Sequence, residues 1–217
     1  MRIRSIAASL ATTALLAGAI VVPTTAAQAE SSPAQKALGN RSLAKVLTSD
    51  GNRFDRNWGD YDIVTEAVLA VLASKPQSAV GLLTDGSARA TAFIPTDRAF
   101  QHLVRSLTGK TPRTEKKVFA AVAGLGIDTV ETVLLYHVVP GATITYKQAV
   151  KADGAELKTA QGGAVTVDVR HHWWFKQVRL QDLDPNARDP RVIVPDINKG
   201  NKQIAHGIDR VLRPVDL

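Results

Sequence analysis

The 217-residue sequence contains no cysteine. A disulfide framework is therefore excluded, as is a lipid-modified cysteine at an export site, so a hydrophobic core must hold the fold together. The sequence also lacks a Gly-x-Ser-x-Gly nucleophile elbow, a glycine-rich phosphate loop and a trio of metal ligands. No spacing suggests shared chemistry among the five histidines, which are His102, His137, His171, His172 and His206. These absences predict a protein that is not an enzyme and needs no cofactor or metal.

The first 29 residues have the composition of a secretory signal peptide. Arg2 and Arg4 provide a positive start, residues 6–22 are mostly apolar, and Ala-Gln-Ala at residues 27–29 offers a small-x-small cleavage site. The apolar stretch is shorter than the roughly 20 residues that a membrane-spanning helix needs, and polar residues interrupt it. We therefore predict cleavage rather than anchoring, which makes the mature protein secreted or extracellular.

Removal of residues 1–29 leaves two regions. Residues 30–41 are expected to form a flexible lead, and residues 42–217 suit a single domain. The formal net charge of +7 falls to +5 without Arg2 and Arg4, which favours anionic surfaces without identifying a partner. The basic residues are scattered, and those at 110–117 fit a solvated helix face better than a nucleic-acid site. We expect no integral membrane segment after cleavage, so the protein is released or held non-covalently at the cell wall.

Thr91–Phe100, with the sequence TAFIPTDRAF, predicts a buried strand that turns directly into an amphipathic helix. The β-branched and aromatic residues before Pro95 suit a strand, and Pro95 ends its ladder because proline has no N–H to donate. Thr96 is placed to cap the helix, with Asp97 at the positive end of the helix dipole. Phe100 begins the apolar stripe of that helix.

Two later segments give this motif a context: LLYHVVPG at residues 134–141 and QIAHGIDRVLRP at residues 203–214. In this order, the three segments resemble the motifs of the fasciclin domain family. The residues that fill the motif positions are Thr91, Phe93, Pro95, Thr96, Asp97, Ala99 and Phe100, then Tyr136 and His137, and finally Ile208, Asp209, Val211, Leu212 and Pro214. The resemblance implies an α+β fold, a twisted β-sandwich or wedge with several helices packed alongside. It also implies that the motif residues are mainly structural.

His137 lies between apolar neighbours, with no second histidine or acid at ligand spacing. Histidines in that setting are usually buried and hydrogen-bonded within the core. We therefore expect its ring to bond backbone groups and to fix the turn that follows, rather than to act in catalysis.

Residues 50–62, DGNRFDRNWGDYD, are dense in turn-forming residues and allow a calcium-loop interpretation. Positions 1, 3, 5, 7 and 12 of such a loop would be Asp55, Asn57, Gly59, Tyr61 and Glu66. Gly59 brings no side-chain oxygen, however, and Asp60 occupies the position that requires glycine. The aromatic residues of the segment better fit anchors that pin a long loop to the core, so we predict no metal site.

Further secondary structure follows from capping residues and periodicity. Asp62 can cap a helix over residues 63–73, and Asp128 with Glu131 forms an Asp-x-x-Glu start similar to a capping box. Beyond residue 141 the pattern changes toward strands. The valines of residues 164–169 alternate with other residues, which predicts a hairpin with one buried face.

Residues 170–176, RHHWWFK, place three consecutive aromatic residues between cations. If the segment continues a strand, Trp173 and Trp174 face opposite sides, one inward and one to solvent. An exposed indole stacks well on sugar rings and is common in interface hot spots. The alternative, which we favour, is a hairpin whose aromatic residues cover an open end of the sandwich.

Asp196 and Ile197 form a second candidate binding pair, in the tripeptide that begins at Pro195. The resemblance aligns this tripeptide with the Pro-Asp-Ile motif to which integrin adhesion is attributed in some animal relatives. Here Val194 and Asn198 replace the Glu and Met that flank the motif.

The family resemblance implies a non-catalytic adhesion protein. Its expected partner is a cell-surface or matrix protein, or an envelope glycan, and not nucleic acid. The alternative is a carbohydrate-binding module that uses Trp173 and Trp174. The sequence identifies neither the ligand nor the oligomeric state.

Overall fold

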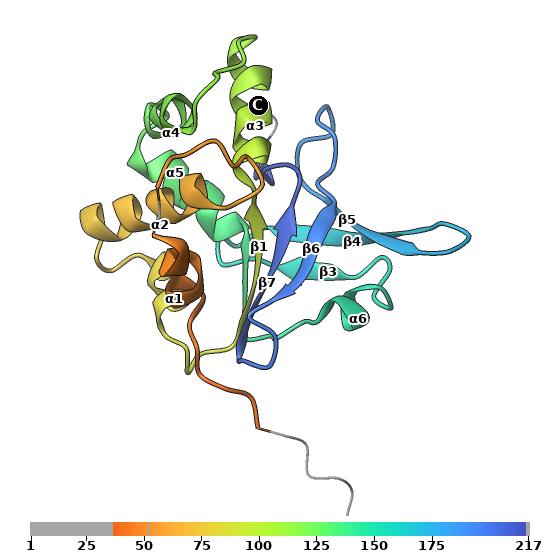
Figure 1. The fold of residues 1–217 in the computed structure, drawn as a ribbon. Helices are drawn as coiled ribbons and strands as arrows, with labels where there is room; N and C mark the ends of the chain where they lie inside the picture. Colours follow the sequence, from red (N-terminus) through yellow and green to blue (C-terminus); the bar gives the residue numbers. More distant parts are fainter. Residues whose placement is uncertain (1–36, 52, 216–217) are drawn as a thin grey trace, which may run out of the picture. The chain divides into compact units, whose positions relative to one another are not determined.

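The computed structural model describes residues 37–51 and 53–215 (Figure 1). The predicted signal peptide, residues 1–29, and the first part of the expected lead lie outside these residues. The helices are α1 (Leu43–Leu47), α2 (Asp62–Ser74), α3 (Asp97–Thr108), α4 (Glu115–Ala123), α5 (Ile127–Tyr136) and α6 (Tyr146–Ala149), with the 3₁₀ turns η1 (Thr48–Asp50) and η2 (Ala79–Thr84). The strands are β1 (Ala90–Pro95), β2 (Val138–Pro140), β3 (Glu156–Lys158), β4 (Ala164–His171), β5 (Lys176–Gln181), β6 (Val192–Ile197) and β7 (Gln203–Ile208). In this part of the chain no single helix is long and apolar enough to cross a membrane; only α4 and α5 together reach that size, and they meet at 105°.

Strands β1 and β7 form the centre of a four-stranded sheet with the order β2-β1-β7-β6. They run parallel, from the pair Ala90–Gln203 to the pair Pro95–Ile208. Every residue of both strands is buried, as expected of strands that are covered on both faces. The outer strands β2 and β6 pair antiparallel with β1 and β7.

A three-stranded sheet, β3-β4-β5, completes a sandwich with the first sheet. Val165, Val167 and Val169 of β4 are buried, whereas the residues between them are more exposed, so the predicted alternation is confirmed. These valines share one apolar cluster with Phe93 of β1 and Ile208 of β7. The cluster therefore joins the inner faces of the two sheets.

Helices α1 to α5 cover the opposite face of the four-stranded sheet. A larger apolar cluster includes residues from α1 to α5 together with Ala92 and Ile94 of β1 and Ala205 of β7. Because successive strand residues point to opposite faces, β1 contributes Phe93 to the sandwich and its neighbours to the helical layer. The predicted α+β fold, with helices packed alongside a β-sandwich, is confirmed.

The 91–100 motif folds as predicted, with Thr96 as the cap and Asp97 as the first residue of α3, and Asp97 has a further partner that the sequence did not show. Thr96 is the N-cap of α3, and its hydroxyl accepts a hydrogen bond from the N–H of Ala99. Asp97 is fully buried, and its Oδ1 accepts a hydrogen bond from the N–H of Ile63 at 2.9 Å. The first residue of α3 thus satisfies a free backbone donor at the start of α2.

Two of the predicted helix caps are wrong. The N-cap of α2 is the residue before Asp62, which itself lies in the first helical turn. The N-cap of α5 is Gly126, so Asp128 and Glu131 lie inside the helix and make no capping box. Both acids pair instead with Lys75, just beyond the end of α2. Partners from distant segments therefore replace the local ones that the sequence suggested.

The end of the expected flexible lead is bound to the turn before β7. Gly39 forms a parallel bridge with Asn201, and its N–H donates to the carbonyl of Gly200 at 2.8 Å. The carbonyl of Arg41 accepts a hydrogen bond from the side chain of Asn198 at 2.8 Å. The lead is therefore part of the fold at this end, because its backbone groups find partners in the turn.

Candidate functional site

The β4–β5 hairpin carries the three consecutive aromatic residues at its tip. β4 ends at His171 and β5 begins at Lys176, so Trp173 and Trp174 lie in the turn and not on a strand. Trp173 is 89% exposed, Trp174 is 72% exposed and Phe175 is 45% exposed. The prediction that one tryptophan points inward is therefore wrong, and so is the prediction that the aromatic residues cover the sandwich.

The reason is the length of the hairpin beyond the core. Val169 pairs with Val178, and both are buried. The ladder then continues for two further pairs, to His171 and Lys176, before the turn begins. Figure 1 shows the β4–β5 hairpin reaching well past the rest of the sandwich. The aromatic residues follow the turn into solvent.

The rings of the tip pack against one another. His172 stacks on Phe175, with ring centroids 4.4 Å apart and planes 11° from parallel. Trp173 and Trp174 have centroids 4.7 Å apart and planes tilted by 58°. The N–H of His172 also donates to the carbonyl of Phe175 at 2.9 Å, which closes the turn. The tip therefore holds its own shape and leaves both indoles accessible.

Asp196 and Ile197, the second candidate pair, are not part of this tip. Oδ1 of Asp196 accepts a hydrogen bond from the N–H of Tyr146 at 2.7 Å, and Oδ2 pairs with Lys199 at 3.0 Å. Ile197 packs, partly buried, against the helical apolar cluster. The hydroxyl of Tyr146 also donates to the carbonyl of Lys176 at 2.8 Å. One residue of α6 thus contacts both the Asp196 carboxylate and the base of the tip.

His137 is buried, and both of its ring nitrogens contact backbone groups. Nδ1 lies 2.7 Å from the carbonyl oxygen of Val133, and Nε2 accepts a hydrogen bond from the N–H of Leu212 at 2.9 Å. Because the N–H of Leu212 can only donate, the proton of the neutral ring is on Nδ1. Burial lowers the pKa of His137 to about 4, so the ring is neutral at pH 7. The expected backbone bonds are present, and they join the end of α5 to the C-terminal segment.

The other motif residues also lie inside the fold. The hydroxyl of Tyr136 donates to the carbonyl of Ala164 at 2.7 Å, which ties α5 to β4. The carboxylate of Asp209 accepts hydrogen bonds from the N–H and the guanidinium of Arg191 at 2.7 and 2.8 Å. The buried motif residues are Thr91, Phe93, Pro95, Thr96, Asp97, Ala99, Phe100, Tyr136, His137, Ile208, Asp209, Val211, Leu212 and Pro214. Their side chains face the interior rather than a partner.

Three carboxylates from separate segments lie together at one edge of the helical layer. Asp60, Asp97 and Glu115 each offer an oxygen within 4.8 Å of the others. Burial raises the pKa of Asp97 to about 8 and also raises that of Glu115, and the charge of Asp60 adds to both effects. Carboxylate oxygens are ligands that Ca²⁺ prefers, so these residues can supply part of a calcium site. The grouping was not predicted, because Asp97 and Glu115 lie outside the calcium-like loop.

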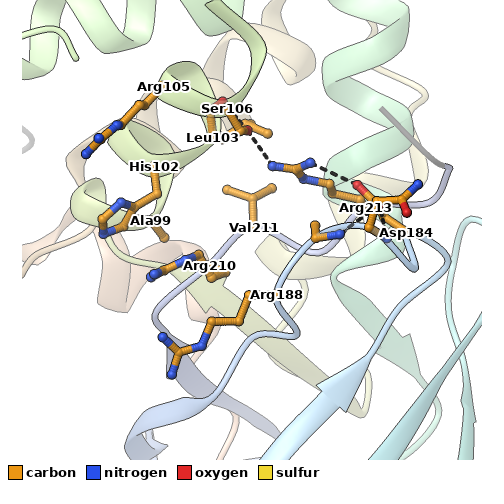
Figure 2. A pocket seen from close by; sticks show the side chains of 12 residues that line it. Ala99, His102, Leu103, Arg105, Ser106, Asp184, Arg188, Arg210, Val211 and Arg213 are labelled. Carbon is orange, nitrogen blue, oxygen red and sulfur yellow. Dashed lines mark hydrogen bonds and ion pairs between the residues drawn. The ribbon is translucent and has the colours of Figure 1, made fainter. Parts of the chain in front are cut away.

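A cleft of about 450 Å³ lies between α3, the loop that joins β5 to β6, and the segment that follows β7. Its charged and titratable residues are His102, Arg105, Asp184, Arg188, Arg210 and Arg213. Arg213 donates to Asp184 at 2.9 Å and to Ser106 of α3 at 2.6 Å, as Figure 2 shows. Arg213, from the segment after β7, thus joins α3 to the β5–β6 loop at one end of the cleft.

The remaining cations of the cleft repel one another. Burial lowers the pKa of Arg210, the charge of Asp209 opposes this shift, and the nearby Arg188 and Arg191 lower the pKa further. Burial also lowers the pKa of His102, with further contributions from Arg210 and Arg98. An anion in the cleft would relieve this repulsion. The cleft was not predicted, because its cations come from distant segments of the sequence.

Comparisons with known proteins agree with this architecture. The family model of the Fasciclin domain matches residues 66–214, which include all three sequence motifs. A similar fold occurs in the solved structure of a FAS1 domain pair from the insect cell adhesion molecule fasciclin I. The two chains are 18% identical with a TM-score of 0.54, and the match covers 81% of this chain and 51% of that chain. This chain thus spans about half the length of the solved pair. No curated protein matches the sequence.

Proposed function

Because this chain belongs to the fasciclin domain family, we propose that it is a secreted, non-catalytic adhesion protein whose β4–β5 tip binds a protein of a cell surface or matrix. The predicted signal peptide supports the extracellular location. The protein with the similar fold is a cell adhesion molecule, which supports the interaction role.

The exposed aromatic tip is the observation that carries the proposal. Trp173 and Trp174 expose most of their surface, at 89% and 72%, on a hairpin that projects from the sandwich. Exposing two indoles to water is unfavourable in isolation, and contiguous exposed apolar surface commonly marks an interaction site. Tryptophan is also among the residues most enriched at binding hot spots. The tip therefore has both the position and the composition of an adhesive contact.

The angle between the indoles favours a protein partner over a glycan at the tip. A flat platform for a chain of sugars needs coplanar ring faces, whereas Trp173 and Trp174 are tilted by 58°. Tilted rings form a wedge, and a wedge suits an apolar pocket on a partner protein. A carbohydrate-binding module is the second candidate, because each exposed indole face can still stack on one sugar ring.

The hydrogen bonding of His137 and the lack of common catalytic motifs support a non-catalytic role. His137 is neutral, buried and bonded to backbone at both nitrogens, so it has no free position for a substrate. The sequence also lacks the nucleophile elbow and the phosphate loop of common enzyme classes.

The test compares the parent protein with a Trp173→Ser/Trp174→Ser double variant. The protein probes are immobilised fibronectin and collagen, and the glycan probes are the neutral polysaccharides cellulose and chitin. Self-association is measured by binding of the protein to beads that carry the same protein. We expect the parent to bind a protein probe or itself, and the double variant to bind at least about tenfold more weakly, as loss of hot-spot residues predicts. Both substituted residues are exposed, so the unfolding free energy should change by less than about 0.5 kcal/mol.

The matched control is Leu69→Ser, which replaces another exposed apolar residue, on α2. It should bind like the parent. Equal binding by the double variant and the parent would remove the tip from the proposal. Binding to cellulose or chitin alone, lost in the double variant, would replace the protein partner with a glycan.

A further inference from the structure

A second cleft adjoins the arginine-lined cleft of Figure 2 and shares His102 and Arg210 with it. It adds three basic residues: Arg56 from the loop before α2, Arg98 from α3 and Arg191 from the position just before β6. We call the combined surface the arginine face. It consists of Arg56, Arg98, Arg105, Arg188, Arg191, Arg210, Arg213 and His102.

The arginine face accounts for most of the net positive charge of the chain. Seven arginines line the two clefts, against two acids, Asp184 and Asp209, which leaves a surplus of five positive charges. The whole sequence has a formal charge of +7, of which Arg2 and Arg4 supply two. The rest of the molecule is therefore close to neutral, and one surface carries the net charge. Such a surface attracts polyanions.

Not all of this charge is compensated within the fold. Arg213 pairs with Asp184, and Arg191 pairs with Asp209 at 2.8 Å. Among the described residues, the guanidinium groups of Arg105 and Arg188 form no hydrogen bond or ion pair. A guanidinium has five donors and stays charged, so these two side chains can bind an incoming anion without breaking a contact.

The composition of the face indicates the class of the anion. All of its permanent cations are arginine, whose planar fork pairs with carboxylate, sulfate or phosphate groups through two parallel bonds. Between the cations of the first cleft lie apolar side chains, such as Leu103 and Val211. Among the residues that the structure describes, no indole or phenyl ring lines that cleft, and Trp58 in the second cleft is already covered by Arg98 at 5.7 Å. Surfaces for single-stranded nucleic acid interleave cations with open aromatic rings, so this face does not fit them.

We propose that the arginine face binds an acidic polysaccharide, whose repeated carboxylate or sulfate groups pair with successive guanidinium groups. Two adjoining clefts accommodate an extended chain better than a single small anion. The β4–β5 tip contributes no residue to this face, so the proposal is independent of the protein contact proposed for the tip.

The experiment measures binding of the full chain to immobilised heparin, which carries sulfates, and to polygalacturonate, which carries carboxylates. Single-stranded poly(U) RNA serves as the competing class of polyanion. We expect binding to at least one polysaccharide that weakens steeply with salt, because ion pairs at a surface are screened. Tighter binding to heparin would identify sulfate as the preferred group, and tighter binding to polygalacturonate would identify carboxylate.

The decisive variants reverse two charges in different places. Arg105→Glu/Arg188→Glu changes the two uncompensated arginines and should weaken polysaccharide binding by at least about tenfold. Lys116→Glu/Lys117→Glu changes the net charge equally at exposed positions of α4, and should weaken it by less than about threefold. The milder Arg105→Gln/Arg188→Gln variant covers the case in which the charge reversal perturbs folding. It should also weaken polysaccharide binding more than Lys116→Glu/Lys117→Glu does.

Three results would overturn the proposal. They are no binding to either polysaccharide, equal weakening by the two charge reversals, and binding to poly(U) that is as tight as to the polysaccharides. Trp173→Ser/Trp174→Ser should leave polysaccharide binding unchanged. That variant separates failure of the arginine face from failure of the tip.

Discussion

Replacement of His137 by alanine should destabilise the domain strongly without involving any binding site. The variant removes the acceptor for the N–H of Leu212 and the donor to the carbonyl of Val133. Leu212 is fully buried, so water cannot replace the lost acceptor. A buried donor left without a partner costs about 1–3 kcal/mol, and the cavity left by the ring adds to this. We expect a total loss of about 3–5 kcal/mol of unfolding free energy.

Chemical and thermal unfolding measure this loss. In a domain of this size, 1 kcal/mol shifts the melting temperature by about 2–4 °C, so His137→Ala should melt about 6–20 °C below the parent. The matched control is His172→Ala, which removes the same side chain from the exposed tip and should change the stability by less than about 0.5 kcal/mol. If the two variants melt alike, the buried hydrogen bonds of His137 do not stabilise the fold as argued.

The pH dependence gives a second signature of the same residue. The pKa of His137 is about 4 in the folded state, below its ordinary value of 6.5. The unfolded chain therefore takes up a proton below pH 6.5 while the folded chain does not, so stability is complete above pH 6.5 and falls as the pH drops toward 4. At 1.36 kcal/mol per pH unit, this histidine accounts for a loss of up to about 3 kcal/mol. His137→Ala should lose correspondingly less stability over that range.

Four further predictions concern other parts of the fold. The pKa of Asp97 is raised to about 8, so the stability that this residue contributes is lost as the pH rises from about 4 to 8. Asp97→Asn keeps an acceptor for the N–H of Ile63 and does not titrate, so the stability of this variant relative to the parent should improve over that range. A difference between the two proteins that stays constant with pH in urea melts would contradict this. Gly86→Ala should prevent correct folding, because the added Cβ would overlap the backbone of the residues that enter α1; a parent-like melting curve would refute the overlap. Tyr136→Phe should cost about 1–3 kcal/mol, because the carbonyl of Ala164 loses its donor, and a loss below about 0.5 kcal/mol would count against that bond. Finally, a chelator should leave the melting temperature unchanged, whereas a drop that calcium reverses would indicate that Asp60, Asp97 and Glu115 bind a cation.

The parts of the fold that could be predicted from the sequence depend on neighbouring residues. The cap by Thr96 and the alternation of the valines in β4 follow from local hydrogen bonding and from the period of a strand, so both were predicted correctly. The role of Asp97 depends on Ile63, which is 34 residues away along the chain. Nothing in the local pattern distinguishes an acid that supports its own helix from one that caps another.

The candidate sites were harder to predict because both depend on long-range geometry. The exposure of Trp173 and Trp174 follows from how far the β4–β5 ladder runs beyond the core, and the periodicity of the sequence does not show where the core ends. The arginine face depends on which segments meet. Arg105 and Arg188 lie 83 positions apart in the sequence and line one cleft, although the even distribution of basic residues suggested that they form no site.

The parallel pairing of β1 with β7 has a consequence for the order in which the chain can fold. Ala90 pairs with Gln203, which is synthesised 113 residues later, so the central strand has no partner on that side until β7 has been synthesised. Contacts between such distant residues slow folding, and an unpaired apolar strand edge promotes aggregation in the meantime. The domain should therefore fold slowly and only after synthesis of β7, and its nascent chain should depend on chaperones to keep the β1 edge from pairing with other chains.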